Sequence, residues 1–124
     1  MPWPLFRRLL VVVLVLYWVA LFLGTHVPGD AVDSKLNDKL LHFGAYAGLA
    51  ALLMWTISPQ RHAFSVTLAA LAGLSLYGLI DELLQIPIAS RNCDPVDLMA
   101  DVAGCVSGLI VYWLARSLPE FGRS

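Results

Sequence analysis

The stretch LLVVVLVLYWVALFL (Leu9–Leu23) decides the fold, because it carries no charged residue over its whole length. A helix that crosses a bilayer needs about 20 predominantly apolar residues. The apolar window extends over residues 5–23 and includes Arg7 and Arg8 near its start. A basic start also suits a secretory signal peptide, but no A-x-A cleavage pattern follows it. We therefore predict that residues 5–23 form a retained transmembrane helix.

Three more windows have the same character, at approximately residues 40–57, 63–88 and 96–115. None of them alternates between apolar and polar residues as a half-buried strand would. The chain is 59% apolar and 14% charged, whereas soluble domains have about 45–50% and about 25%. A soluble domain of this size has too little interior to bury so many apolar residues. We predict an all-α membrane protein, a four-transmembrane-helix bundle forming a single domain over residues 1–124.

The charged residues and cysteines exclude several classes of protein. A net charge of −1 provides no basic field for nucleic acid, so no nucleic-acid partner is expected. Cys93 and Cys105 form no CxxC pair, which argues against a zinc site or a disulfide framework. With the N-terminus inside, five basic residues fall on the cytoplasmic side and three outside. The positive-inside rule then favours an N-in/C-in orientation.

Polar residues in the second window share one face of the predicted helix. Asp38, His42 and Tyr46 follow one another at intervals of four residues. Such residues drift by only about 40° per step on an α-helix, so they form one stripe. His26 and His62, by contrast, fall between windows and are predicted to be solvated loop residues.

The third and fourth windows carry acidic residues at matching depths. SLYGLIDELLQIPI (Ser75–Ile88) places Asp81, Glu82 and Gln85 within roughly a 100° arc. Asp97 and Asp101 lie one turn apart in the fourth window. Asp97 also suits a helix N-terminus, whose positive end attracts carboxylates. A carboxylate inside a span costs about 2.5–3.5 kcal/mol at the centre and less near the ends. We therefore predict that these groups converge on one polar pocket that faces outward.

Small residues repeat at four-residue intervals along two of the predicted helices. Gly44 and Gly48 form one such ridge, and Ala100, Gly104 and Gly108 form another. Ridges of this kind allow close backbone approach between helices in lipid. They suit packing within the bundle and equally a homo-oligomer.

Three segments, taken in order, resemble the VanZ-like family. They are DKLLHFGAY (38–46), GLIDELLQ (78–85) and SRNCDPVDLMADVAGCVSG (90–108). Ala89-Ser90 stands before Arg91 where that family often has Pro-Gly, and Asp101 stands where it often has Asn. The resemblance implies a small multi-pass protein of the bacterial cytoplasmic (inner) membrane. The founding member of that family is associated with low-level teicoplanin resistance.

The resemblance also implies a polar signature, and we assign roles to its residues and to Asp81, which stands beside Glu82 in the third window. His42, Glu82 and Asp38 are the candidate catalytic residues, with His42 as a base oriented by Asp38 and Glu82 as an acid. The candidate ligand-binding residues are Tyr46, Asp81, Gln85, Arg91, Asp97 and Asp101. Arg91 suits a phosphate or carboxylate, or neutralises the acidic cluster.

Two hypotheses for the function stay open at this point. In the first, the pocket binds or modifies an envelope lipid or a lipid-linked cell-wall precursor, with or without catalysis. No recognised metal motif is present, so no cofactor is expected; a divalent metal held by His42, Glu82, Asp97 and Asp101 is the alternative. In the second hypothesis, the polar cluster is structural, and the chain is a non-enzymatic scaffold or a partner-binding protein.

Overall fold

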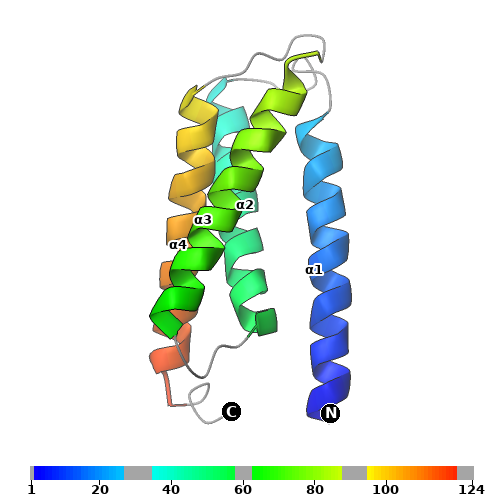
Figure 1. Cartoon of the computed structure of the whole chain (residues 1–124), viewed down its shortest axis with the longest axis vertical. Coiled ribbons are helices and arrows are strands. Elements are labelled where there is room, and N and C mark those ends of the chain that lie inside the picture. The colour runs from blue at the N-terminus through cyan, green and yellow to red at the C-terminus, as the bar shows by residue number, and fades with distance from the viewer. Residues whose placement is uncertain (1, 27–34, 58–62, 88–94, 120–124) are drawn as a thin grey trace.

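Four long helices make up the computed structural model, which describes residues 2–26, 35–57, 63–87 and 95–119. The helices are α1 (Trp3–Thr25), α2 (Lys35–Ile57), α3 (Ala63–Gln85) and α4 (Pro95–Ser117). They run alternately up and down, so that the N-terminal end of α1 and the C-terminal end of α4 lie at the same end of the bundle (Figure 1). No strand occurs within the described residues.

Each helix is long enough and apolar enough to cross a membrane. At about 1.5 Å per residue, a helix of 23 residues exceeds the hydrocarbon thickness of about 30 Å. The predicted all-α, four-helix membrane fold is therefore confirmed. The helices run past the apolar windows at several ends, most clearly in α2, which begins at Lys35 rather than near residue 40. Backbone hydrogen bonding continues into the polar first turn, where hydropathy alone gives no signal.

The closest helix pair is α2 and α4, and glycine makes that contact possible. A Cβ atom on Gly104 would overlap the carbonyl oxygen of Phe43, and one on Gly108 would overlap that of Ala47. The ridge predicted in the fourth window thus packs inside the bundle. The predicted ridge in the second window fits less well, since nothing lies within 4 Å of a Cβ on Gly44.

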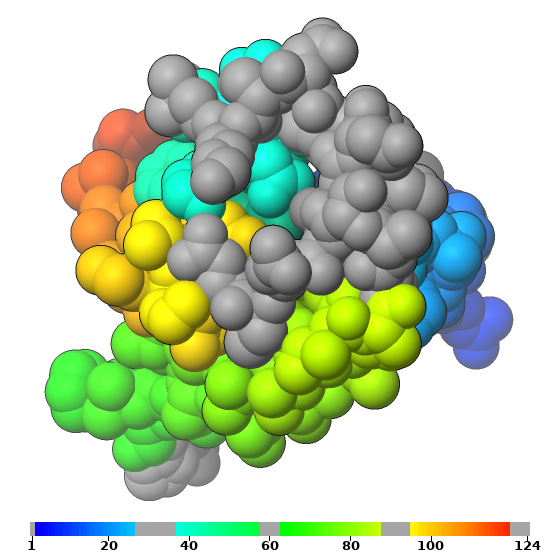
Figure 2. All heavy atoms as spheres, turned by 90° about the horizontal axis from the view of Figure 1, so that it is seen from above, coloured from blue at the N-terminus to red at the C-terminus, as the bar shows by residue number. Residues whose placement is uncertain are grey.

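Helix α1 lies at the margin of the bundle. It packs mainly against α2, and only Leu14, Leu21 and Thr25 of its residues are buried. The Tyr17 hydroxyl donates a hydrogen bond of 2.6 Å to the carbonyl of Ala45 on α2. Seen from the end that holds the polar residues, α1 lies at the edge beside the group formed by α2, α3 and α4 (Figure 2).

Most of the outer surface is apolar, as a bilayer requires. Phe64, Leu16 and Leu114 are 76%, 64% and 63% exposed, respectively. Such exposure of large apolar side chains would destabilise a soluble monomer. In a membrane these side chains meet acyl chains, and the buried polar residues are the ones that need an explanation.

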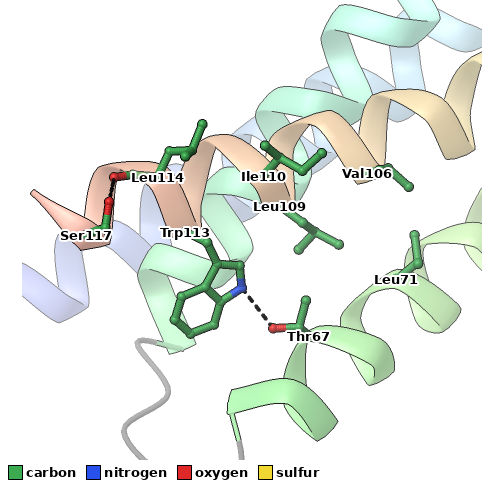
Figure 3. A pocket seen from close by; sticks show the side chains of 8 residues that line it. All are labelled: Thr67, Leu71, Val106, Leu109, Ile110, Trp113, Leu114 and Ser117. Atoms are coloured by element: carbon green, nitrogen blue, oxygen red, sulfur yellow. Dashed lines mark hydrogen bonds between the residues drawn. The ribbon is translucent and has the colours of Figure 1, made fainter.

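An apolar groove of about 440 Å³ lies between α3 and α4, toward the C-terminal half of α4. Figure 3 shows Leu71 of α3 facing Val106 and Leu109 of α4 across it. At one end the Trp113 indole donates a hydrogen bond of 3.0 Å to the Thr67 hydroxyl. The groove lies away from the acidic residues of α3 and α4, so it is not the predicted polar pocket.

Candidate functional site

The acidic residues gather at one end of the bundle, opposite the chain termini. The C-terminal ends of α1 and α3 meet the N-terminal ends of α2 and α4 there (Figure 1). This follows from the up-and-down arrangement, which places residues late in one helix beside residues early in the next. The polar groups of the second, third and fourth windows are therefore brought to one depth.

His42 and Asp101 form the central pair of this cluster. His42 Nδ1 lies 2.7 Å from Asp101 Oδ1, and the two side chains are only 3% and 0% exposed. With Asp101 ionised, its carboxylate can only accept, so Nδ1–H is the donor in this hydrogen bond. On α3, Gly78 allows this arrangement, because a Cβ there would come to 3.3 Å from Asp101 Oδ2.

Two further carboxylates flank the same imidazole. Glu82 Oε1 of α3 lies 3.8 Å from Nδ1, and Asp38 Oδ2 lies 3.9 Å from Nε2. Asp38 is thus near His42, as predicted, but the hydrogen-bonding partner that orients the ring is Asp101. His42 therefore contacts carboxylates from its own helix, from α3 and from α4.

Lys39 and Asp97 border the cluster on its more exposed side. Lys39 Nζ of α2 donates a hydrogen bond of 2.8 Å to Asp97 Oδ1 in the first turn of α4. The Lys39 side chain is 27% exposed and that of Asp97 8%. This pair links the ends of α2 and α4 near the membrane surface.

Asp81 belongs to a second polar group, between α1 and α3. Its carboxylate accepts hydrogen bonds from the Thr25 hydroxyl at 3.0 Å and from Gln85 Nε2 at 3.3 Å. His26 Nδ1 lies 3.7 Å from the same carboxylate. His26 was predicted to be a solvated loop residue, and that prediction is wrong. It directly follows α1, and its Nε2 is buried.

Tyr46 is wholly buried one turn below His42 on α2, and its ring centroid lies 6.1 Å from that of Tyr77. Among the described residues, the buried side-chain atoms without a hydrogen-bond partner include Tyr46 Oη, Gln85 Oε1 and Asp101 Oδ2. Such atoms are rare inside proteins and need an explanation.

Eight of the nine predicted site residues lie at this end of the bundle, in or beside the group around His42 and the group around Asp81, and the ninth, Arg91, is outside the described residues. The eight are Asp38, His42, Tyr46, Asp81, Glu82, Gln85, Asp97 and Asp101. Sequence reasoning missed the contacts of Thr25, His26, Lys39 and Tyr77. For Thr25 and His26 one signal was available: in an up-and-down bundle the end of the first helix meets the end of the third.

Two overlapping groups have the donor atoms and spacing to hold a metal ion. One comprises Asp38, His42 and Asp97; the other comprises His42, Glu82 and Asp101. In each group the donor atoms lie within 4.8 Å of one another. Imidazole nitrogen with carboxylate oxygen is a donor set suited to Zn²⁺ or Mn²⁺.

The fold and the cluster define a class of protein: a small four-helix membrane protein with an acid-rich, histidine-centred group inside one end. The model of the VanZ/LLP1 family matches residues 11–116, and the chain therefore belongs to that family. It is also 25% identical, over 105 residues, to a protein from Schizosaccharomyces pombe described as uncharacterized protein C11E3.10. That match covers 85% of this chain and 62% of the yeast protein. No solved structure matches the chain.

Proposed function

We propose that this VanZ/LLP1-family protein binds or modifies the polar head of an envelope lipid or a lipid-linked cell-wall precursor at the outer face of the bacterial cytoplasmic membrane. Through that ligand it influences susceptibility to teicoplanin. The polar cluster at one end of the bundle is the proposed site. Asp38 and Lys39 form its more exposed edge, where a head group would approach.

The observation that carries the proposal is the setting of His42. Three helices contribute carboxylates around one buried imidazole. Intramembrane ionisable groups are expensive and are generally kept for a function. A single pair would be enough to fix the register of two helices. The carboxylates of Glu82 and Asp38 are therefore not required for helix register. They lie beside the two ring nitrogen atoms through which a histidine transfers protons.

The arrangement also supports a chemical role for His42. Asp101 holds the proton on Nδ1 and leaves Nε2 to accept or donate one, on the side where Asp38 lies. A histidine oriented by a carboxylate is a common general base. Glu82, 3.8 Å from Nδ1, is the acid candidate. Because carboxylates outnumber basic groups among the described residues at this end, the entering head group should bring positive charge, as its own amine or as a bound cation.

A second candidate function is a non-enzymatic scaffold. The cross-helix hydrogen bonds of Lys39 with Asp97 and of His42 with Asp101 favour it, since they tie α2 to α4. Under this alternative, the cluster specifies how the helices pack, and a protein partner binds elsewhere. The cluster would then matter for protein abundance and for nothing else.

We expect Glu82→Gln and Asp97→Asn to abolish the effect of the protein on envelope lipids while the protein remains in the membrane. Both changes keep the shape of the side chain and remove its charge. The measurement is the lipid and lipid-linked precursor composition, with teicoplanin susceptibility, in cells that lack or carry each variant. His42→Ala should behave in the same way if it accumulates.

Ser107→Ala is the matched control, because the Ser107 hydroxyl only donates to the Ala103 carbonyl of its own helix. Membrane abundance is measured for every variant. A lost phenotype at normal abundance supports a site. An unchanged phenotype at normal abundance would contradict the proposed function, and loss of abundance in step with loss of phenotype would support the scaffold.

Single-cysteine labelling tests the proposed orientation. In a Cys93→Ser, Cys105→Ala background, we expect Ser34→Cys to react with a membrane-impermeant thiol reagent in intact cells. Arg61→Cys should react only after permeabilisation, because the positive-inside rule places that segment in the cytoplasm. Reaction at 61 in intact cells would invert the orientation and move the cluster to the cytoplasmic face.

A further inference from the structure

We infer that His42, Glu82 and Asp101 form a binding site for a divalent metal ion of the Zn²⁺ or Mn²⁺ class. The three donor groups come from α2, α3 and α4 and lie within 4.8 Å of one another. The side chains of His42, Glu82 and Asp101 are 3%, 1% and 0% exposed. Metal binding itself does not depend on the proposed lipid ligand; only a role for the ion in holding a head group rests on the proposed function.

The distances fit ligands that share one ion. Bonds from Zn²⁺ to nitrogen or oxygen are about 2.0–2.2 Å long. Two donors on the same ion are therefore about 3 Å apart when adjacent and no more than about 4.4 Å when opposite. His42 Nδ1 lies 2.7 Å from Asp101 Oδ1 and 3.8 Å from Glu82 Oε1. All three donor atoms lie within 4.8 Å of one another, so rotation of the side chains would bring both carboxylates onto one ion.

The charge balance points to a cation at this position. Glu82 and Asp101 face one imidazole in a region of low dielectric, with Asp38 on the far side of the same ring. Burying several carboxylates is costly unless cations or protons offset them. Lys39 neutralises Asp97 at the margin, 2.8 Å away. A divalent ion between His42, Glu82 and Asp101 would place two positive charges directly beside the carboxylates of the triad.

A separate observation comes from buried polar atoms beside the triad. Asp101 Oδ2 has no hydrogen-bond partner among the described residues, although Asp101 is wholly buried. The Tyr46 hydroxyl, equally buried and one helical turn below His42, has none there either. A metal ion and its coordinated water would satisfy such atoms: the second carboxylate oxygen can bind the ion, and the phenol can hydrogen-bond the water.

Binding changes the protonation of the site in a defined way. The proton on His42 Nδ1, which is donated to Asp101, must leave before that nitrogen can coordinate the ion. A neutral ring meets this requirement by carrying its proton on Nε2, whereas an imidazolium ring must release one proton. The affinity should therefore fall as the pH is lowered. No redox change and no other reactant is involved.

The experiment measures binding of the metal alone to the purified full-length chain. The protein is prepared in detergent with a tag that contains no histidine, in the Cys93→Ser, Cys105→Ala background to remove thiol ligands. Equilibrium dialysis against Zn²⁺ and against Mn²⁺, with metal content measured by mass spectrometry, gives stoichiometry and affinity. We expect one ion per chain for at least one of the two metals.

Glu82→Gln and Asp101→Asn should each weaken binding at least about tenfold. Asp81→Asn is the matched control: Asp81 neighbours Glu82 on α3 and is as deeply buried, but lies outside the triad. It should leave the affinity within about twofold. Equal losses in Asp81→Asn and Glu82→Gln would overturn the proposal, because they would show diffuse attraction of cations rather than a site.

A spectroscopic measurement on the parent chain tests the metal site even if the variants fail to fold. Co²⁺ substituted into a site with nitrogen and carboxylate donors gives visible d–d bands. We expect such bands to saturate at one equivalent and to disappear on addition of excess Zn²⁺. Folded protein that binds neither Zn²⁺ nor Mn²⁺ stoichiometrically and gives no Co²⁺ bands would refute the metal site. The proposed lipid function would still be open to its own test.

Discussion

Gly108→Val is expected to destabilise the bundle by at least about 3 kcal/mol and to abolish most of the folded protein. At this position α4 lies against the backbone of α2, and a Cβ would overlap the carbonyl oxygen of Ala47. A flexible side chain could rotate away, but a backbone carbonyl in the middle of a helix cannot. The two helices would have to separate, which would disturb the largest interface of the molecule. Overpacking of this kind commonly costs about 1–3 kcal/mol and more where backbone must move.

The measurement is unfolding in detergent, by temperature or by denaturing surfactant, with size-exclusion profiles to follow folded protein. Gly44→Ala and Gly73→Ala are the controls, because no atom lies within 4 Å of a Cβ at either position. They should be neutral or more stable by about 0.5–1 kcal/mol, since alanine is the better helix former. If Gly108→Val unfolded like the parent, the close approach of α2 and α4 described above would be incorrect.

The fold was predictable because the amino-acid composition of a membrane-spanning helix differs clearly from that of the segments around it. Uninterrupted apolar windows can be read directly from the sequence, and in lipid a helix satisfies its own backbone hydrogen bonds. The ends of the helices were harder to predict from the sequence. The first turn of α2 is polar, so hydropathy placed its start near residue 40, whereas the helix begins at Lys35.

The gathering of the acidic residues was predictable for a related reason. Helical periodicity put Asp38, His42 and Tyr46 on one stripe, and the cost of carboxylates in lipid required them to face one another. Which carboxylate hydrogen-bonds to His42 was not predictable from the sequence. Asp38 is one turn from His42 on the same helix and was the natural partner by sequence. The structure instead places Asp101 at 2.7 Å, since rotation of α4 and the space at Gly78 decide which carboxylate reaches the ring.

The contacts of helix α1 were still harder to predict from the sequence. Its sequence is so uniformly apolar that no face stands out, and the contact of Thr25 with Asp81 depends wholly on how the helices are arranged. The long apolar stretch that decided the fold therefore said nothing about the site. The information lies in two residues at its end, Thr25 and His26, which hydropathy assigns to a connection.

A double-mutant cycle on His42 and Asp101 separates the two candidate functions. We expect His42→Leu alone to destabilise the protein by about 3–5 kcal/mol, because it leaves the Asp101 carboxylate buried without its donor. Asp101→Leu alone should also be costly, since it removes the acceptor of a buried donor. The pair His42→Leu/Asp101→Leu replaces both groups by apolar side chains. It should be more stable than the sum of the two single changes predicts, with a coupling of about 1–3 kcal/mol.

The matched control combines His42→Leu with Thr67→Val, since Thr67 lies near the opposite end of α3 and its effect should add to that of His42→Leu. The informative comparison is between stability and phenotype in the His42→Leu/Asp101→Leu protein. A site that binds or modifies a lipid needs the imidazole itself, so this protein should be folded, abundant and inactive. A scaffold needs only helices held in place, so restored stability would restore the phenotype. Recovery of both would therefore refute a binding or catalytic role for His42, whereas recovery of stability alone would refute the scaffold.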